Sequence, residues 1–309
     1  MATAWLASMI LGRVDVGPED LDEESADGGS LWLVVGSDDR TDLPTSITAV
    51  GGADGARADV ILLLAVNEDG HPPVRAVRLP RELMVSTPSH GRQRLGALLD
   101  HGPAALVTGV RAATGLPVHH YAELDMAAVV QVVDALDGLE LHLPHPARDS
   151  RSGLQLGAGT QHLDGQAALA YVRSRTYEEQ HGGRWEVTGR GVASRVDRQD
   201  RIITAVAELA EQAGPLDRLA AVRAVGDHLS VDRAAGPGDL DRLVSGVRQG
   251  PWTPVSLSVA TMLPDTEVVS PFPPAHRGTF PAVDVRQHEA DDQLEALLGR
   301  RTGPAGEDE

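Results

Sequence analysis

The chain has 309 residues and a formal net charge of −18, with the share of hydrophobic residues (41%) that is usual for a folded soluble protein. This acidic balance argues against general nucleic-acid binding, which needs a basic surface. All 27 basic residues are arginine and cysteine is absent, which excludes Schiff-base lysines, P-loop lysines, cysteine nucleophiles, disulfides and cysteine metal sites.

The first part of the chain predicts strands followed by helices. Residues 1–30 are read as a flexible lead-in, because the segment is acidic and glycine-rich. Apolar and alternating runs predict three buried strands, at residues 31–35, 59–66 and 74–79. Helical patterns are expected at residues 92–100 and 104–114, where Gly115 is a stop signal.

The second part continues the alternation of strands and helices. Asp125 and Asp164 are expected to cap two helices, at residues 126–136 and 167–172. A turn-rich connector is expected at 154–163. Further strands are expected at residues 118–124, 139–143 and 255–260, and further helices at 195–211, 216–228 and 239–247. This order predicts one α/β domain at residues 31–263, followed by a partly disordered tail rich in proline and glycine at 264–309.

Three short polar clusters lie at the ends of predicted strands, where ligands bind in open α/β sheets. They are Gly36-Ser37-Asp38-Asp39-Arg40, Arg57-Ala58-Asp59 and Pro80-Arg81-Glu82. Carboxylates from two such loops, Asp38 and Asp59, are able to hold a hard divalent cation together with substrate phosphates. The alternative is that both carboxylates only cap turns and pair with arginines.

Residues 166–201 carry seven arginines in an otherwise acidic chain. Arg195, Arg198 and Gln199 share one helix face, and the same stripe continues into the apolar residues 202, 206 and 209, which must face the core. The arginines therefore extend a buried face, and a phosphate bound there would explain them. The alternative is a solvated, arginine-rich surface paired with Glu178, Glu179 and Asp197.

Two arginines flank a serine at residues 173–175. In an extended segment Arg173 and Arg175 would project to the same side, which suits a pyrophosphate. The histidines at 119, 120, 142 and 145 lack a metal-binding pattern such as HExxH, so we interpret them as structural or surface residues.

The ordered set of motifs resembles the LytR–CpsA–Psr (LCP) family of cell-wall glycopolymer ligases. The resemblance covers about residues 31–210. The matching motifs are LVVGSDDR (33–40), RADVILLLAVN (57–67), VRAVRLPRE (74–82), RLGALLDHGPAALVTGVRAATGLPVHHYAELD (94–125), VVDALDGLELHL (132–143), LDGQAALAYVRSR (163–175) and RVDRQDRIITAV (195–206).

The resemblance implies a single LCP-like α/β domain with a central mixed sheet flanked by helices and an apolar groove for a polyprenyl lipid. It implies a phosphotransferase that moves a polyprenyl-pyrophosphate-linked polysaccharide onto peptidoglycan and releases the lipid phosphate. It also implies an extracytoplasmic location at the membrane surface. No stretch of the chain approaches the roughly 20 apolar residues of a membrane span, so the family's N-terminal anchor is expected upstream or is missing.

The resemblance also assigns roles to residues by position. Asp38 and Asp59 correspond to the carboxylates that hold Mg²⁺ or Mn²⁺. The expected catalytic residues are Arg81, Glu82, Arg173, Arg175 and Arg198. The expected pyrophosphate-binding residues are Arg40, Arg81, Arg173, Arg175, Arg195, Arg198 and Gln199.

The chain departs from the family pattern at four places. Glu82 replaces an aspartate, Gly96 ends a tripeptide that is usually Lys-Ile-Asn, and Asp200 replaces the second glutamine of an RQQ motif. Val192 stands where the family has an aspartate three residues before Arg195. Three interpretations therefore remain. The first is an LCP-type transferase, whose catalysis these departures would weaken, and the second is a non-catalytic polyprenyl-phosphate-binding or regulatory protein. The third is an unrelated α/β protein whose arginines are scattered.

Overall fold

A seven-stranded mixed sheet forms the centre of the protein. The computed structural model describes residues 11–17, 21–23, 29–37, 57–67, 74–190, 192–226, 228–247, 255–256, 259–263 and 282–285. The strand order is β1-β14-β7-β2-β3-β4-β15. The strands are β1 (Gly12–Val14), β2 (Ser30–Ser37), β3 (Ala58–Val66), β4 (Arg75–Arg78), β7 (His120–Leu124), β14 (Leu229–Asp232) and β15 (Val255–Ser256).

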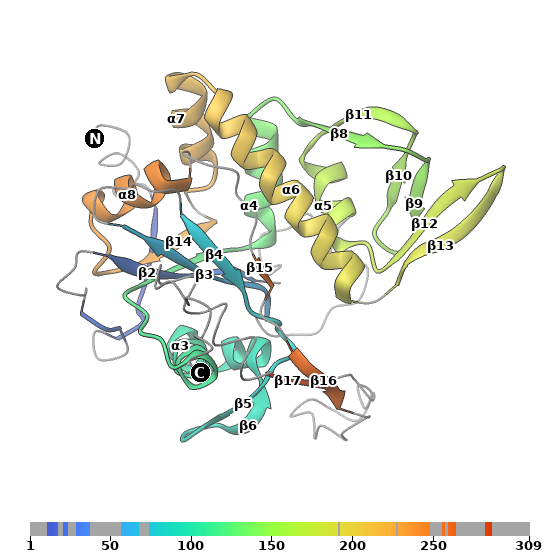
Figure 1. The fold of residues 1–309 in the computed structure, drawn as a ribbon. Coiled ribbons are helices and arrows are strands. Elements are labelled where there is room, and N and C mark those ends of the chain that lie inside the picture. Colours follow the sequence, from blue (N-terminus) through green and yellow to red (C-terminus); the bar gives the residue numbers. More distant parts are fainter. Residues whose placement is uncertain are drawn as a thin grey trace, which may run out of the picture.

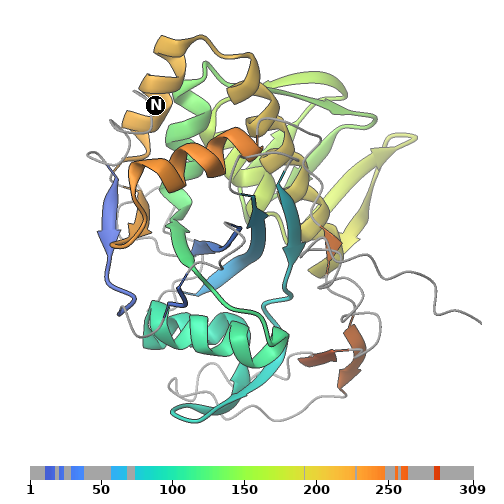
Figure 2. The same cartoon turned by 60° about the vertical axis from the view of Figure 1, so that its left-hand side comes forward.

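The central strands are apolar on both faces, because both faces of the sheet are covered. Leu31, Leu33 and Val35 of β2 pack toward the 3₁₀ helix η2 (Leu95–His101) and α3 (Pro103–Thr114). Trp32 of β2 and Leu62 of β3 lie in the core on the opposite face. Figures 1 and 2 both place α3 on one side of the sheet and the remaining α-helices on the other.

The second helical layer covers the face of the central sheet opposite α3, and several small sheets complete the fold. Its helices are α4 (Met126–Ala135), α5 (Gly165–Arg173), α6 (Val192–Gln212), α7 (Pro215–Ala224) and α8 (Pro237–Val247). The small sheets combine β5 (Met84–Thr87) with β6 (Gly91–Arg94), β8 (Leu139–Leu143) with β11 (Gly159–Leu163), and β16 (Val259–Leu263) with β17 (Ala282–Val285). A four-stranded sheet has the order β10-β9-β12-β13 and contains β9 (Ala147–Asp149), β10 (Leu154–Leu156), β12 (Thr176–His181) and β13 (Arg184–Arg190).

Two aspartate caps fix where α4 and α5 begin, as the sequence predicts. Asp125 accepts a hydrogen bond from the amide of Ala128 (2.9 Å), and Asp164 accepts one from the amide of Ala167 (2.8 Å). The first amide of α5, that of Gly165, donates to Asp134 of α4 (2.7 Å). A Cβ at Gly165 would lie 2.4 Å from the carbonyl oxygen of Val130, so glycine allows the two helices to approach closely.

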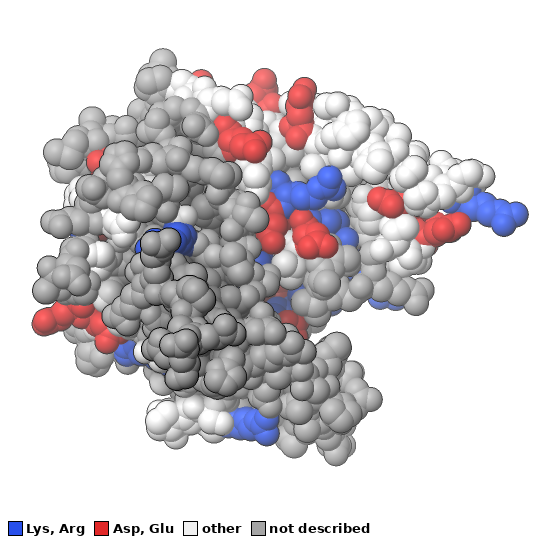
Figure 3. All heavy atoms as spheres, in the orientation of Figure 1, with Lys and Arg blue, Asp and Glu red and all other residues white. Residues whose placement is uncertain are grey.

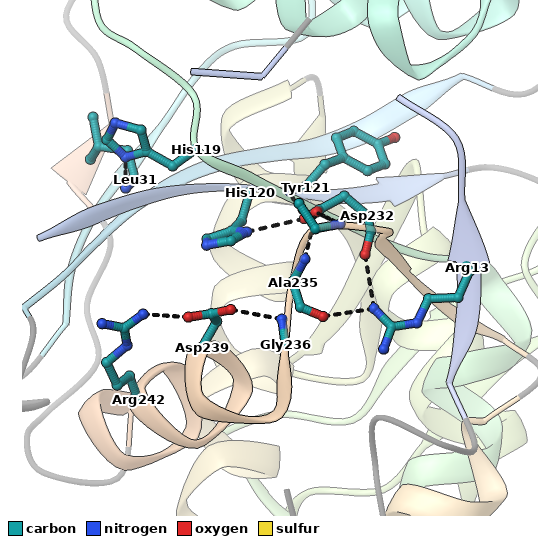
Figure 4. Close-up of polar contacts among 11 residues, drawn as sticks. Arg13, Leu31, His119, His120, Tyr121, Asp232, Ala235, Gly236, Asp239 and Arg242 are labelled. Atoms are coloured by element: carbon teal, nitrogen blue, oxygen red, sulfur yellow. Dashed lines mark hydrogen bonds and ion pairs between the residues drawn. The ribbon is translucent and has the colours of Figure 1, made fainter. Parts of the chain in front are cut away.

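Asp232 contacts β7 through its buried carboxylate and the start of the described chain through its backbone carbonyl oxygen. Asp232 accepts hydrogen bonds from the amides of Tyr121 (2.9 Å) and Ala235 (2.8 Å), and His120 Nδ1 lies 3.3 Å from its Oδ2 (Figure 4). Arg13 of β1 donates to the carbonyl oxygens of Asp232 (2.9 Å) and Ala235 (2.7 Å). The lead-in that the sequence predicts to be flexible therefore contains a strand, which pairs with β14.

The structure corrects three further expectations. The segment expected to be helical at 92–100 is split between β6 and η2. The connector expected at 154–163 contains β10 and β11, and the β12–β13 hairpin was not predicted. Figures 1 and 2 show this hairpin projecting from the molecule, and its polar strands lack the apolar alternation that identifies a strand in sequence. Of the predicted tail, only β17 lies among the described residues.

Within the part of the chain that the structure describes, no helix combines the length and the apolar character that crossing a bilayer requires.

Candidate functional site

A guanidinium joins two of the predicted carboxylates at the edge of the central sheet. Arg81 forms an ion pair with Asp59 of β3 through NH1, and its Nε donates to Glu82 Oε1 at 2.8 Å. The Asp59 and Glu82 side chains are 8% and 12% exposed, so both carboxylates are largely removed from water. Burial lowers the pKa of Arg81, but the charges of Asp59 and Glu82 more than compensate and raise it. This arginine therefore stays charged.

The 3₁₀ helix η2 contacts the backbone of Arg81. The amide of Gly96 donates to the carbonyl oxygen of Arg81 (2.9 Å). A Cβ at position 96 would lie 2.7 Å from the carbonyl oxygen of Ala58 and 2.9 Å from the Cβ of Arg81. The glycine that departs from the family pattern thus allows η2 to pack directly against the segment that carries Arg81.

The buried stripe predicted on α6 is confirmed. Arg195, Arg198 and Gln199 are 6%, 4% and 7% exposed, and Ile202 follows them into the core that α6 shares with α5 and β8. The buried Nε atoms of Arg195 and Arg198 make no hydrogen bond to any described residue. Buried cations with spare donors are costly unless an anion compensates them. The solvated-surface interpretation is therefore wrong for these two arginines.

The structure corrects where this helix begins. The sequence places its start near Arg195, whereas α6 begins at Val192. Arg195 is therefore the fourth residue of the helix, where the macrodipole has nearly faded. An anion at this position would therefore be held by the buried guanidinium more than by the helix terminus.

Arg195 lies beside the cluster formed by Asp59, Arg81 and Glu82. Its NH1 is 3.9 Å from Asp59 Oδ2, and its NH2 is 4.0 Å from Glu82 Oε1. Burial, followed by the nearby positive charge of Arg81, lowers the pKa of Arg195, and Arg175 adds to the same effect. Arginines from three separate segments thus repel one another here, and a bound dianion would relieve that repulsion.

The segment that carries Arg173 and Arg175 is organised by a carboxylate that the sequence interpretation missed. Asp149 at the end of β9 accepts hydrogen bonds from Ser174 Oγ (2.7 Å) and from the amides of Arg175 and Thr176 (both 2.8 Å). Burial alone would raise the pKa of Asp149, but the hydrogen bonds led by that of Thr176 lower it to about 2. One ionised carboxylate therefore fixes the backbone between the two arginines. No sequence motif marks it, because its partners are mostly backbone amides 26 residues away.

The two arginine-bearing elements meet at Ser174. Arg198 NH2 donates to the carbonyl oxygen of Ser174, and the guanidinium lies 4.9 Å from the ring centre of Tyr177. Arg175 is exposed and Arg173 half-buried beside this contact. The prediction that both elements converge on one place is supported for Arg195 and Arg198 with the 173–175 segment, so the scattered-arginine interpretation is wrong.

A second missed residue, Arg78 of β4, accommodates the departure at Asp200. Arg78 NH2 forms an ion pair with Asp200, and its NH1 lies 3.5 Å from Gln199 Oε1. Burial raises the pKa of Asp200 although Arg78 opposes the shift. Figure 3 shows basic and acidic side chains side by side in the region of α6.

The remaining predicted residues fall into two groups. Asp38 and Arg40 lie outside the described residues. Among the histidines, His119 accepts a hydrogen bond from the amide of Leu31 (2.7 Å) and His120 faces Asp232, so both have the structural role expected of them. Among the described residues no group of three or more potential ligands is placed to hold a metal ion. Asp59 and Glu82 nevertheless share Arg81 and present the hard oxygen ligands that Mg²⁺ prefers.

Comparison with known proteins shows which family this sequence and fold match. The model of the LytR_cpsA_psr family matches residues 14–236. A probable cell wall biosynthesis protein LcpB of Corynebacterium glutamicum is 34% identical over 221 residues, which cover 70% of this chain and 50% of that protein. The cell wall biosynthesis protein LcpA of the same organism is 26% identical and is covered to 44%. The chain thus spans half or less of the length of these two relatives.

Solved structures agree with the sequence matches. A LytR-Csp2A-Psr enzyme from Actinomyces oris superposes with a TM-score of 0.69 at 28% identity, over 93% of this chain and 95% of that chain. A structure of TagT bound to LIIa-WTA superposes with a TM-score of 0.60 at 18% identity, over 91% of this chain and 95% of that one, which supports the fold alone. The TagT of Bacillus subtilis, named a polyisoprenyl-teichoic acid–peptidoglycan teichoic acid transferase, is 30% identical over 40% of each chain. From the extent of the family match and the shared fold, we conclude that this chain belongs to the LytR–CpsA–Psr family.

Proposed function

We propose that the protein transfers a polyprenyl-pyrophosphate-linked glycopolymer to peptidoglycan and releases the lipid phosphate. The observation that carries this proposal is the juxtaposition of Arg81, Arg195 and two buried carboxylates, with Arg198 held one helical turn further along α6. Such a site matches the needs of phosphoryl transfer, in which charge neutralisation and positioning supply most of the catalysis. The printed names of relatives as cell-wall biosynthesis proteins and teichoic acid transferases agree with it.

In the proposed reaction an oxygen of a peptidoglycan sugar hydroxyl attacks the phosphorus that bears the glycopolymer. The bond from this phosphorus to the oxygen of the lipid phosphate breaks, which leaves a phosphodiester and free polyprenyl phosphate. Arg81, Arg195 and Arg198 neutralise the pyrophosphate, while Gln199, Arg173, Arg175 and Arg40 complete its binding site. Glu82 is our candidate for the base that accepts the hydroxyl proton, because its carboxylate lies between Arg81 and Arg195.

A divalent cation fits the same site. Asp59, with Asp38 from the neighbouring loop, would hold Mg²⁺ or Mn²⁺ through carboxylate oxygens. When bound, the ion would add positive charge beside the phosphates. Because Asp59 pairs with Arg81 in the structure, the cation and the guanidinium would share this carboxylate.

We also propose that the polyprenyl chain is bound by apolar side chains of the sheet and of α6 that the fold leaves half-buried. Val34 and Val60 lie on the sheet face opposite α3, and Val206 and Leu209 of α6 are also only half-buried. Burying this surface against a polyprenyl chain would contribute roughly 25 cal/mol per Å². A lipid-linked substrate implies work at the membrane surface on the side where peptidoglycan lies, so we propose an extracytoplasmic location.

Transfer from a synthetic polyprenyl-pyrophosphate saccharide to peptidoglycan, with and without Mg²⁺, tests the proposal. We expect release of lipid phosphate that requires the cation, and a loss of about 10²- to 10⁴-fold in Glu82→Gln if Glu82 is the base. Normal turnover in Glu82→Gln would reject the role of Glu82. No turnover by the wild-type protein, together with retained binding of polyprenyl phosphate, would reject the enzyme.

That second outcome would favour the alternative, a non-catalytic polyprenyl-phosphate-binding or regulatory protein. The observation behind it is Val192, which stands at the first position of α6 where the family has a carboxylate. Asp200 weakens the family pattern less, because Arg78 neutralises it.

A further inference from the structure

A hollow of about 490 Å³ lies on the side of α5 that faces the β9–β10 turn. Its walls come from two segments of chain. The turn contributes Ser150, Arg151 and Ser152, β10 contributes Gln155, and α5 contributes Gln166 and Arg173. Figure 1 shows β9, β10 and α5 next to one another at the side of the molecule away from the central sheet.

The chemistry of the lining is unusual for this chain. Two arginines line the hollow and, among the described residues, no carboxylate does, although the chain as a whole has a net charge of −18. Two hydroxyls and two carboxamides add donors and acceptors, and the side chains of Leu154, Leu169 and Ala170 supply an aliphatic floor. This combination suits a ligand that is rich in hydroxyl and amide groups and also carries an acidic group. A volume of this size holds a small organic ligand.

The hollow and the arginine site share one anchor. Asp149 accepts the amide of Arg151 at 2.9 Å, in the turn that walls the hollow, and the amide of Arg175 at 2.8 Å, in the arginine segment. Arg173 belongs to both, because it ends α5 and lines the hollow. A ligand in the hollow would therefore share Arg173 with the proposed pyrophosphate site.

We propose that this hollow is a saccharide subsite that binds a sugar bearing a carboxylate or phosphate next to the reacting phosphate. This inference rests on the proposed function. Two substrates of the transfer carry such chemistry: the acceptor glycan, through the lactyl carboxylate of muramic acid wherever no peptide is attached to it, and the donor polymer, through a sugar phosphate. Arg151 recognises the acidic group, and the carboxamides of Gln155 and Gln166 contact the sugar.

Equilibrium titration of the full chain with two soluble probes tests the subsite. The acceptor probe is N-acetylglucosaminyl-N-acetylmuramic acid, and the donor probe is N-acetylglucosamine 1-phosphate. Arg151→Ala is expected to weaken binding of one probe roughly tenfold, which is the usual effect of losing a charge-assisted hydrogen bond. The affected probe identifies the source of the ligand. Gln155→Ala is a second variant, which removes a neutral side chain from the same wall. It is expected to weaken binding of the same ligand to a smaller extent.

Arg148→Ala is the matched control, because it removes the same charge from the neighbouring strand. Arg148 is exposed, pairs with Glu178 (2.6 Å) and covers the ring of Trp185, outside the hollow. Absence of binding by both probes to the wild-type protein, or equal losses in Arg148→Ala and Arg151→Ala, would overturn the subsite. Because binding is measured without turnover, a protein that binds a probe but transfers nothing would retain the subsite and lose the proposed function.

Discussion

Arg198 of α6 donates a hydrogen bond to the backbone carbonyl of Ser174, which lies between Arg173 and Arg175. This contact fixes the position of α6 relative to the end of α5. The hydroxyl of Ser174 in turn donates a hydrogen bond to the carboxylate of Asp149 (2.7 Å). A chain of contacts therefore runs from β9 through the arginine segment to the buried stripe of α6.

Replacing Arg198 by alanine should remove both the contact with Ser174 and one charge at the proposed phosphate site. We expect a loss of about 10²- to 10³-fold in transfer, the range found when one preorganised donor is removed. The matched control is Arg201→Ala on the same helix. Arg201 is exposed, and its side chain donates to the hydroxyl of Tyr171 (3.1 Å). If the two variants lose activity equally, Arg198 has no special role.

Replacing Asp149 by asparagine should destabilise the protein in a pH-dependent way. The pKa of Asp149 is about 2 in the folded protein and near its ordinary 3.8 when unfolded. This carboxylate therefore stabilises the fold fully above about pH 4, and its contribution disappears as the pH falls through 2. The difference between the two pKa values corresponds to a contribution of about 2 kcal/mol to the free energy of unfolding at pH 7.

Urea unfolding of wild-type protein and Asp149→Asn from pH 2 to 7 measures this contribution. The gap between the two stabilities should narrow as the solution becomes more acidic. Asp197→Asn serves as control, because Asp197 is an exposed residue of α6. A gap that stays constant over the whole range would mean that the charge of Asp149 is not what holds the segment.

Adding a methyl group at Gly96 should disturb Arg81. The new Cβ would lie 2.7 Å from the carbonyl oxygen of Ala58, which is backbone and unable to turn away. We expect Gly96→Ala to cost about 1–3 kcal/mol of stability, the range for overpacking, and to lower transfer by shifting Arg81. Thermal unfolding and the transfer assay together measure both effects.

Gly238→Ala is the control for that substitution, since a Cβ there meets no atom within 4 Å and the residue lies in α8. It should be neutral or slightly stabilising because alanine favours a helix. Unchanged stability of Gly96→Ala would show that η2 moves away without cost.

Restoring an aspartate at position 192 distinguishes the two proposed functions. A carboxylate at the first position of α6 would interact favourably with the helix dipole and stabilise the helix by about 0.3–1 kcal/mol. If catalysis is present but weakened, Val192→Asp should raise turnover while the affinity for polyprenyl phosphate changes little. Val192→Asn is the uncharged control. A protein that gains no turnover with aspartate, and has none to begin with, fits the binding role instead.

Local signals in the sequence were sufficient for most elements of the fold and for part of the site. The apolar runs of β2 and β3 and the caps at Asp125 and Asp164 depend on neighbours in sequence, so their patterns are readable directly. The periodicity of α6 also placed Arg195, Arg198 and Gln199 on its buried face, which the structure confirms. The residue roles assigned by family resemblance remain predictions.

Other features depend on contacts between distant residues, and only the tertiary structure decided them. Asp149 accepts hydrogen bonds from backbone amides 26 and 27 residues further along the chain. Arg78 pairs with Asp200, which is 122 residues away, and Arg13 donates to the backbone of Asp232, which is 219 residues away. None of these partners leaves a periodic pattern, because the hydrogen bonds form only once β9, β4 and β1 are in place. The sequence by itself determined the family, the central strands and the buried arginine stripe. Only the tertiary structure showed that Asp149 fixes the segment 173–175 beside a polar hollow.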